Sequence, residues 1–209
     1  MSGQPAEKRG ERVLTFALHL AAAVFSLPML AGCERVTSPV HGMAVTRPEF
    51  GRDFALFDPA GQLRHLADYR GKVVVIFFGY TQCPDVCPTT LTTMAEVMQQ
   101  LGEDSRRVQV LFITLDPQRD TRPLLATYVP HFHPSFVGLS GDAATTAAVA
   151  REFRVFYQQR PGSTADSYSI DHSTSSYLYD PQGRLRLVEK YGTAAAQLVA
   201  DIRWLLAGS

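Results

Sequence analysis

The chain has 209 residues, of which 45% are apolar, so it is long enough for one domain of ordinary size with a packed core. Its 20 basic residues balance 20 acidic residues at neutral pH. Because no stretch carries a basic stripe, the sequence excludes nucleic acid as an expected ligand.

The N-terminal residues 1–32 have the features of an export signal. A small basic region, EKRGER, precedes the apolar run VLTFALHLAAAVFSLPML, and this order is typical of secretory signal peptides. An uncleaved anchor helix would need roughly 18 or more apolar residues, whereas His19 and Pro28 interrupt this run. An uncleaved anchor and a cleaved signal peptide are therefore both considered, and the residues that follow decide between them.

The signal ends in LAGC, residues 30–33, which resembles the lipobox of bacterial lipoproteins. We therefore expect cleavage before Cys33, lipidation of Cys33, and a protein anchored to a membrane and facing the periplasm. Residues 33–47 are predicted to be a tether, because residues 34–50 hold two prolines and show no sustained period. His41 and Met43 lie in it and are interpreted as incidental.

The domain is expected to occupy residues 48–209. Its sequence predicts two short strands around the turn at residues 58–61, DPAG, and then a long buried strand, KVVVIFF, at residues 72–78. A second DPxG turn at residues 180–183 predicts another hairpin, between SSYLY and RLRLVEK.

Further strands and helices alternate along the rest of the domain. Apolar residues spaced by three and four predict an amphipathic helix that ends at Gly102, namely Leu91, Met94, Met98 and Leu101. There follow a strand at residues 108–116, a helix beginning near Thr121, a short strand SFVGLS, the helix DAATTAAVAREF, and a closing helix capped by Thr193. This order predicts an α/β fold with a mixed sheet flanked by helices.

Cys83 and Cys87 fall between the central strand and the following helix, where open α/β sheets place their sites. The helix N-terminus favours a thiolate, and a spacing of four puts the two sulfurs one turn apart. The pair could form a redox couple or bind a soft metal. A structural disulfide is a third interpretation, although such a short loop removes little entropy from the unfolded chain.

Four segments of the domain resemble successive motifs of the Sco (SenC) family. They are FFGYTQCPDVCPTTL, FITLDPQRDT, FVGLSG and DHSTSSYLYDPQGRL, and the resemblance extends over roughly residues 48–207. It implies a thioredoxin-like fold with an N-terminal hairpin. It also implies a copper-binding factor for cytochrome c oxidase assembly.

The resemblance implies a set of ligands as well. The two cysteines and the distant histidine of the family match Cys83, Cys87 and His172, and an aspartate near the family's site matches Asp116. We expect Asp116 or Asp171 to hold the imidazole or a cysteine proton. Two thiolates and one imidazole suit Cu(I) and tolerate Cu(II), whereas a structural zinc site would need a fourth ligand.

The leading hypothesis is a membrane-tethered copper chaperone that delivers copper to the CuA centre of cytochrome c oxidase subunit II. Alternatives are a thiol-disulfide reductase that keeps the subunit II cysteines reduced, and a redox or copper sensor. Periplasmic copper carriers and thiol reductants are further candidate partners. His172 favours a metal, because dithiol exchange does not need it. A peroxiredoxin-like peroxidase is disfavoured, since FFGYTQC lacks the upstream proline of that loop.

Overall fold

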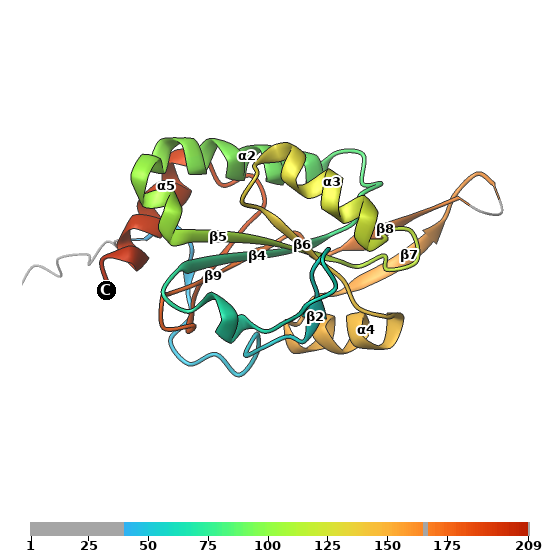
Figure 1. The fold of residues 1–209 in the computed structure, drawn as a ribbon, viewed down its shortest axis with the longest axis horizontal. Coiled ribbons are helices and arrows are strands. Elements are labelled where there is room, and N and C mark those ends of the chain that lie inside the picture. Colours follow the sequence, from blue (N-terminus) through green and yellow to red (C-terminus); the bar gives the residue numbers. More distant parts are fainter. Residues whose placement is uncertain (1–39, 165–166, 209) are drawn as a thin grey trace, which may run out of the picture. The chain divides into compact units, whose positions relative to one another are not determined.

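A six-stranded mixed sheet forms the centre of the computed structural model, which describes residues 40–164 and 167–208 (Figure 1). The export signal and Cys33 lie outside the described residues. In spatial order the strands are β1 (Met43–Ala44), β10 (Leu185–Glu189), β9 (Ser176–Tyr179), β4 (Val73–Gly79), β5 (Val108–Thr114) and β6 (Val137–Leu139). The expected α/β class with a mixed sheet is confirmed.

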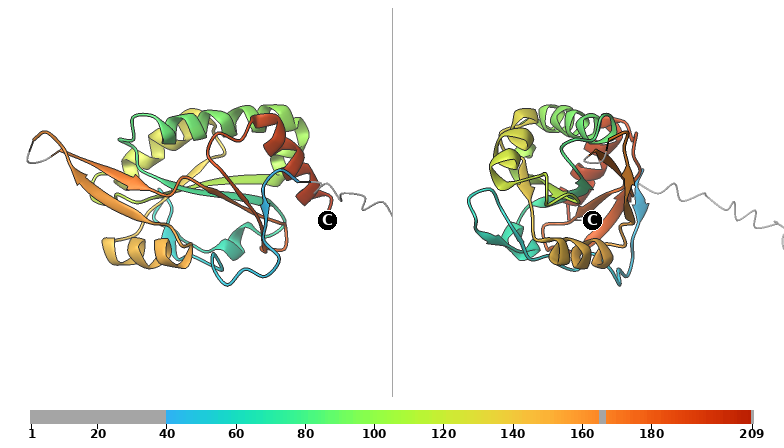
Figure 2. Two further views of the ribbon diagram at one scale, coloured as in Figure 1. Left: turned by 180° about the vertical axis from the view of Figure 1, so that it is seen from behind. Right: turned by 90° about the vertical axis from the view of Figure 1, so that its right-hand side faces the viewer.

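Helices cover both faces of this sheet (Figures 1 and 2). One face packs against α2 (Val86–Leu101), α3 (Arg122–Phe132) and α5 (Ala195–Leu206). The other packs against α4 (Ala143–Glu152) and the segment that holds the 3₁₀ helix η1 (Leu66–Tyr69). A second 3₁₀ helix, η2 (Gly102–Arg107), follows α2. In the part of the chain that the structure describes, no helix has both the length and the apolarity to span a bilayer.

The central strand β4 is buried along its whole length. It pairs in parallel with β5, from Val73 opposite Val108 to Gly79 opposite Thr114, and antiparallel with β9. Alternate residues enter the two cores, Phe77 on one side and Phe78 on the other. A strand that is buried on both faces needs a continuous apolar sequence, which explains the run KVVVIFF.

Both expected hairpins form around their DPxG turns. The first joins β2 (Leu56–Phe57) to β3 (Leu63–Arg64), and the second joins β9 to β10. Each turn is closed by a backbone bond from glycine to aspartate, Gly61 N–H to Asp58 at 2.9 Å and Gly183 N–H to Asp180 at 2.8 Å. Both glycines have φ of +80°, which a residue with a side chain rarely adopts.

A further hairpin was not predicted from the sequence. Strands β7 (Tyr157–Pro161) and β8 (Tyr168–His172) pair with each other in a separate two-stranded sheet. The hairpin projects from the end of the domain opposite β1 (Figures 1 and 2). Because most of its residues are exposed, the sequence YQQRP shows no buried face, and the periodicity that reveals a strand is missing.

The described part of the expected tether, residues 40–47, is folded onto the domain, so the tether prediction is wrong from residue 40 onward. Val40 is buried in the core, and β1 pairs with the edge of β10, Met43 opposite Val188. His41 is not among the candidate metal ligands found in the described residues. It holds this segment on the domain, because its backbone N–H donates to Asp201 at 2.9 Å and its ring nitrogen Nδ1 lies 3.1 Å from the same carboxylate.

Two acids are buried under this segment. Asp201 accepts hydrogen bonds from the backbone N–H groups of His41 and Gly42, and these bonds together with Glu189 lower its pKa although burial alone would raise it. Burial, reinforced by the neighbouring Asp201, raises the pKa of Glu189.

The predicted cap of α5 is wrong by one residue. The hydroxyl of Thr193 donates to the carbonyl oxygen of Lys190 at 2.9 Å, and the helix is capped at Ala194.

The raised pKa of Glu189 makes the domain less stable as pH increases. The folded state holds this proton above the ordinary carboxyl range of about 4 to 5, so the free energy of unfolding decreases with rising pH. Glu189→Gln mimics the protonated acid. Between pH 5 and pH 8 we expect the free energy of unfolding to fall by about 1 kcal/mol or more less in this variant than in the unmodified protein, since each pKa unit is worth about 1.4 kcal/mol. Denaturant unfolding at both pH values measures this free energy.

The exposed Glu103 in η2 offers a matched control, because its carboxylate forms a surface pair with Arg106. Glu103→Gln should leave the pH dependence as it is in the unmodified protein. If the free energy of unfolding of Glu189→Gln depends on pH as in the unmodified protein, the proton is not held by Glu189.

Candidate metal centre

The two cysteines lie where β4 ends and α2 begins, as the sequence predicts. Cys83 is in the turn before the helix, where its backbone N–H donates to Tyr80 at 3.2 Å, and Cys87 is in the first turn of α2. Both are free thiols. Cys83 is partly exposed, whereas Cys87 has only 1% of its surface exposed.

Gly79, the last residue of β4, creates the space for the Cys87 thiol. A Cβ atom at this position would lie 2.5 Å from Cys87 Sγ and 2.8 Å from the ring of Phe112. Real Cβ atoms do not approach their neighbours so closely. The glycine in FFGYT is therefore required by the contact between strand and thiol.

His172 completes a group of three ligands. It ends β8, and its Nε2 lies 3.9 Å from Cys87 Sγ. One ligand atom from each of Cys83, Cys87 and His172 lies within 4.8 Å of the other two, so the three could hold one metal ion. Although 85 residues separate His172 from Cys87 in the sequence, the fold brings them together.

The His172 ring is oriented by the backbone. Its Nδ1 lies 2.8 Å from the carbonyl oxygen of Ser173, and a carbonyl can only accept, so Nδ1 carries the proton. The lone pair of Nε2 is then free on the side of the cysteines. The edge of the ring faces Tyr80, with the two ring centroids 6.1 Å apart. The imidazole is thus held as a neutral ligand requires.

The two thiols have different environments. Burial raises the pKa of Cys87, and the nearby Cys83 adds to this effect, whereas a hydrogen bond with the Tyr80 backbone opposes it. The expectation that the helix N-terminus would favour a thiolate is therefore wrong for Cys87. A metal ion that binds there must displace a proton.

Asp116 and Asp171, which were expected to support the ligands, form their hydrogen bonds with other residues. Among the described residues, Asp171 pairs with Arg160 at 2.7 Å, and both side chains are more than half exposed. Asp171 precedes His172 in a strand, so its side chain points to the opposite face of the hairpin. The buried Asp116 accepts hydrogen bonds from Arg119 and from the hydroxyl of Tyr168, the latter at 2.8 Å. The expectation that either acid holds the imidazole or a cysteine proton is not met.

Another acid near the cysteines, Asp120, was not predicted from the sequence. Its buried carboxylate accepts from Thr81 twice, from the backbone N–H at 3.0 Å and from the hydroxyl at 2.6 Å, and from the hydroxyl of Thr114 at 2.6 Å. Burial raises the pKa of Asp120. Asp120 connects β5 to the loop that carries Cys83. Asp120 lies in FITLDPQRDT, one of the four segments that resemble the Sco family, and this position could have identified it as a candidate site residue.

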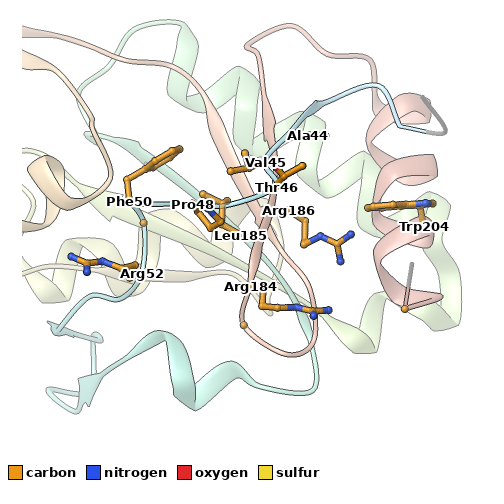
Figure 3. Close-up of a pocket in the computed structure, with 13 residues that line it drawn as sticks. Ala44, Val45, Thr46, Pro48, Phe50, Arg52, Arg184, Leu185, Arg186 and Trp204 are labelled. Carbon is orange, nitrogen blue, oxygen red and sulfur yellow. The ribbon is translucent and has the colours of Figure 1, made fainter. Parts of the chain in front are cut away.

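A groove elsewhere on the domain is separate from this centre. It lies between the segment after β1, the strand β10 and the helix α5, and Pro48, Phe50, Arg184, Arg186 and Trp204 are among its lining residues (Figure 3). The Arg186 guanidinium lies over the Trp204 ring, 5.0 Å from its centroid. None of the three candidate ligands lines the groove.

Comparison with known proteins gives consistent matches. A family model described as SCO1/SenC matches residues 43–207. A mitochondrial SCO2 homolog of Bos taurus is 40% identical over 153 residues, 72% of this chain and 58% of that protein, so the chain spans less than two thirds of this relative.

Solved structures resemble the fold. Bradyrhizobium japonicum ScoI with copper bound is 38% identical, with a TM-score of 0.69 over 75% of this chain and 99% of that one. BsSco, described as a Sco family cytochrome c oxidase assembly protein with a disulfide switch, is 17% identical, with a TM-score of 0.61 over 80% of this chain and 100% of that one. The expected thioredoxin-like fold is confirmed.

The difference between the two thiols can be measured by alkylation. In the reduced, metal-free protein, we expect iodoacetamide to modify Cys83 at least about tenfold faster than Cys87, because a buried, protonated thiol is a poor nucleophile. Fragmentation of the peptide that holds both cysteines, after brief treatment, identifies the modified residue. In guanidinium chloride the two rates should become similar, and equal rates in the folded protein would contradict this difference.

Proposed function

Because the chain belongs to the SCO1/SenC family, we propose that it binds copper through Cys83, Cys87 and His172 and acts in the assembly of cytochrome c oxidase. The observation that carries this proposal is the convergence of two sulfurs and one imidazole nitrogen within 4.8 Å. A relative that is 38% identical has been solved with copper bound.

The chemistry of these ligands suits copper. Thiolates are soft ligands that select Cu(I), and the imidazole also suits Cu(II). Structural zinc almost always has four protein ligands, whereas the group here has three. The partly exposed Cys83 and His172 leave the ion accessible from outside, which suits a protein that releases its metal to a partner.

Delivery to the CuA centre of oxidase subunit II is the function we favour. Sco family proteins act in cytochrome c oxidase assembly and bind copper, and a CuA centre needs copper inserted between thiolates. We further propose that lipidated Cys33 anchors the protein to a bacterial membrane, with the domain in the periplasm. There it would receive copper from periplasmic carriers and electrons from thiol reductants.

A thiol-disulfide reductase is the second candidate, favoured by the unequal exposure of the two cysteines. The Cys83 thiolate would attack a disulfide of subunit II and form a mixed disulfide. The Cys87 thiolate would then displace the partner's sulfur, leaving a Cys83–Cys87 disulfide and a reduced partner. Two electrons and two protons pass to the partner, and an external thiol must restore the pair. A redox or copper sensor could use the same pair.

Copper titration tests the ligand assignment. Reduced protein should bind one copper ion, and either Cys83→Ser or Cys87→Ser should nearly abolish Cu(I) binding, because the thiolates supply most of the affinity. His172→Ala should weaken Cu(II) binding by at least the roughly 10- to 100-fold typical of removing a ligand's supporting partner. Competition with a chromophoric chelator measures both affinities.

Asp171→Asn is the matched control, because Asp171 adjoins His172 but faces Arg160. Its copper affinity should equal that of the unmodified protein. Cu(II) binding that is unchanged in His172→Ala would overturn the ligand assignment. Normal oxidase assembly at low copper in cells that carry His172→Ala would favour the reductase instead.

The proposed anchor is tested separately. Protein from a membrane fraction should have acylated Cys33 as its N-terminus, and Cys33→Ser should remain an uncleaved precursor with unchanged copper affinity. Intact-mass spectrometry gives both results. An intact N-terminus at Met1 in the unmodified protein would contradict the signal assignment.

A further inference from the structure

His172 and the cysteines reach the candidate centre on separate pieces of structure. Cys83 and Cys87 are fixed by the β4–α2 junction of the main sheet, whereas His172 ends β8, which among the strands of the described residues pairs with β7 alone. A hairpin that shares no ladder with the main sheet does not by itself fix the distance between imidazole and thiols. Other contacts must hold it.

One side chain contacts both pieces. The guanidinium of Arg119 stacks on the ring of Tyr168 in β8, 3.5 Å from its centroid, and its Nη1 donates to the Tyr168 carbonyl at 2.9 Å. The same Nη1 donates at 3.1 Å to the side chain of Gln82, which precedes Cys83. Arg119 thus bridges the cysteine loop and the histidine strand.

Asp116 fixes this arginine to the main sheet. It lies just after β5, is 1% exposed, and pairs with Arg119 Nε. Its second oxygen accepts from the Tyr168 hydroxyl at 2.8 Å. Because Asp116 lies at the end of β5 and bonds to both Arg119 and Tyr168, the bridge has a fixed base.

The face of β8 that Arg119 holds is the one that carries the ligand. Side chains two and four residues apart in a strand share a face, so Tyr168, Ile170 and His172 point the same way. Ile170 is buried, with 4% of its surface exposed, while Asp171 is exposed on the other face. A shift of Tyr168 would therefore shift His172 with it.

The geometry assigns Arg119 as a positioning residue that sets the distance of His172 from the two thiols. This inference rests on the proposed function, since it concerns the same three ligands. Arg119 is not one of the three candidate ligands. It acts through Tyr168 and Gln82, and its removal should weaken the contribution of His172 while leaving the dithiol in place.

A double-mutant cycle on the full chain tests this role. Arg119→Met keeps the apolar stem and removes every hydrogen bond, and it should lower Cu(II) affinity by about tenfold or more, the usual effect of losing a group that orients a ligand. In a His172→Ala background the same substitution should change the affinity little. Arg119→Lys keeps the charge but loses the planar stack and should restore only part of the affinity.

A second measurement needs no copper. In the metal-free protein, the His172 and Tyr80 rings should give a nuclear Overhauser contact that Arg119→Met loses. Tyr168→Phe keeps the stacked ring and removes only the hydroxyl bond to Asp116, so it provides a milder variant if Arg119→Met fails to fold. It should weaken both the ring contact and Cu(II) binding to a smaller extent.

Arg160→Met is the control, because Arg160 lies on the same hairpin but pairs with the exposed Asp171. It should change neither readout. The inference would be overturned if Arg119→Met lowered Cu(II) affinity equally in the unmodified and the His172→Ala backgrounds. It would also be overturned if Arg119→Met left the contact between the His172 and Tyr80 rings unchanged. If the unmodified protein binds no copper, the proposed function fails, whereas the ring contact still decides the role of Arg119.

Discussion

The contact between the Cys87 thiol and Gly79 is the constraint on which the rest of the centre depends. It brings the first turn of α2 directly onto the end of β4, and the Phe112 ring lies close to the same glycine. The helix, its buried cysteine and the central strand therefore have one arrangement. Every other ligand must be brought to this fixed sulfur.

The two cysteines differ in exposure because Cys87 is fixed against the central strand. Cys87 is buried, which raises the pKa of its thiol, whereas Cys83 lies in a turn and is partly exposed. An incoming copper ion or disulfide therefore meets Cys83 before it meets Cys87. Under either proposed function, metal transfer or thiol exchange would begin at Cys83 Sγ, which explains why the sequence pattern suits both chemistries.

Local signals in the sequence predict much of this architecture, and contacts between distant residues account for what they miss. The DPxG turns and the apolar run of β4 each specify their own geometry. The Tyr168 hydroxyl that binds Asp116 is 52 residues away in the sequence, and Arg160 meets Asp171 because β7 pairs with β8, so no local pattern reveals these contacts. The exposed hairpin β7–β8 buries too little surface for its sequence to alternate between apolar and polar residues. A strand predicted at residues 168–172 would have placed Asp171 and His172 on opposite faces.

The short strand β1 protects an edge of the sheet. It covers part of β10, and Val45 extends the pairing with a hydrogen bond of 2.8 Å to Arg186. A recombinant fragment that began at residue 48 would lack this strand and would leave the backbone of β10 open to strands of other copies, a recognised route to aggregation. It would also strip Asp201 of the N–H donors of His41 and Gly42. Fragments intended to remain monomeric should therefore begin at or before Val40.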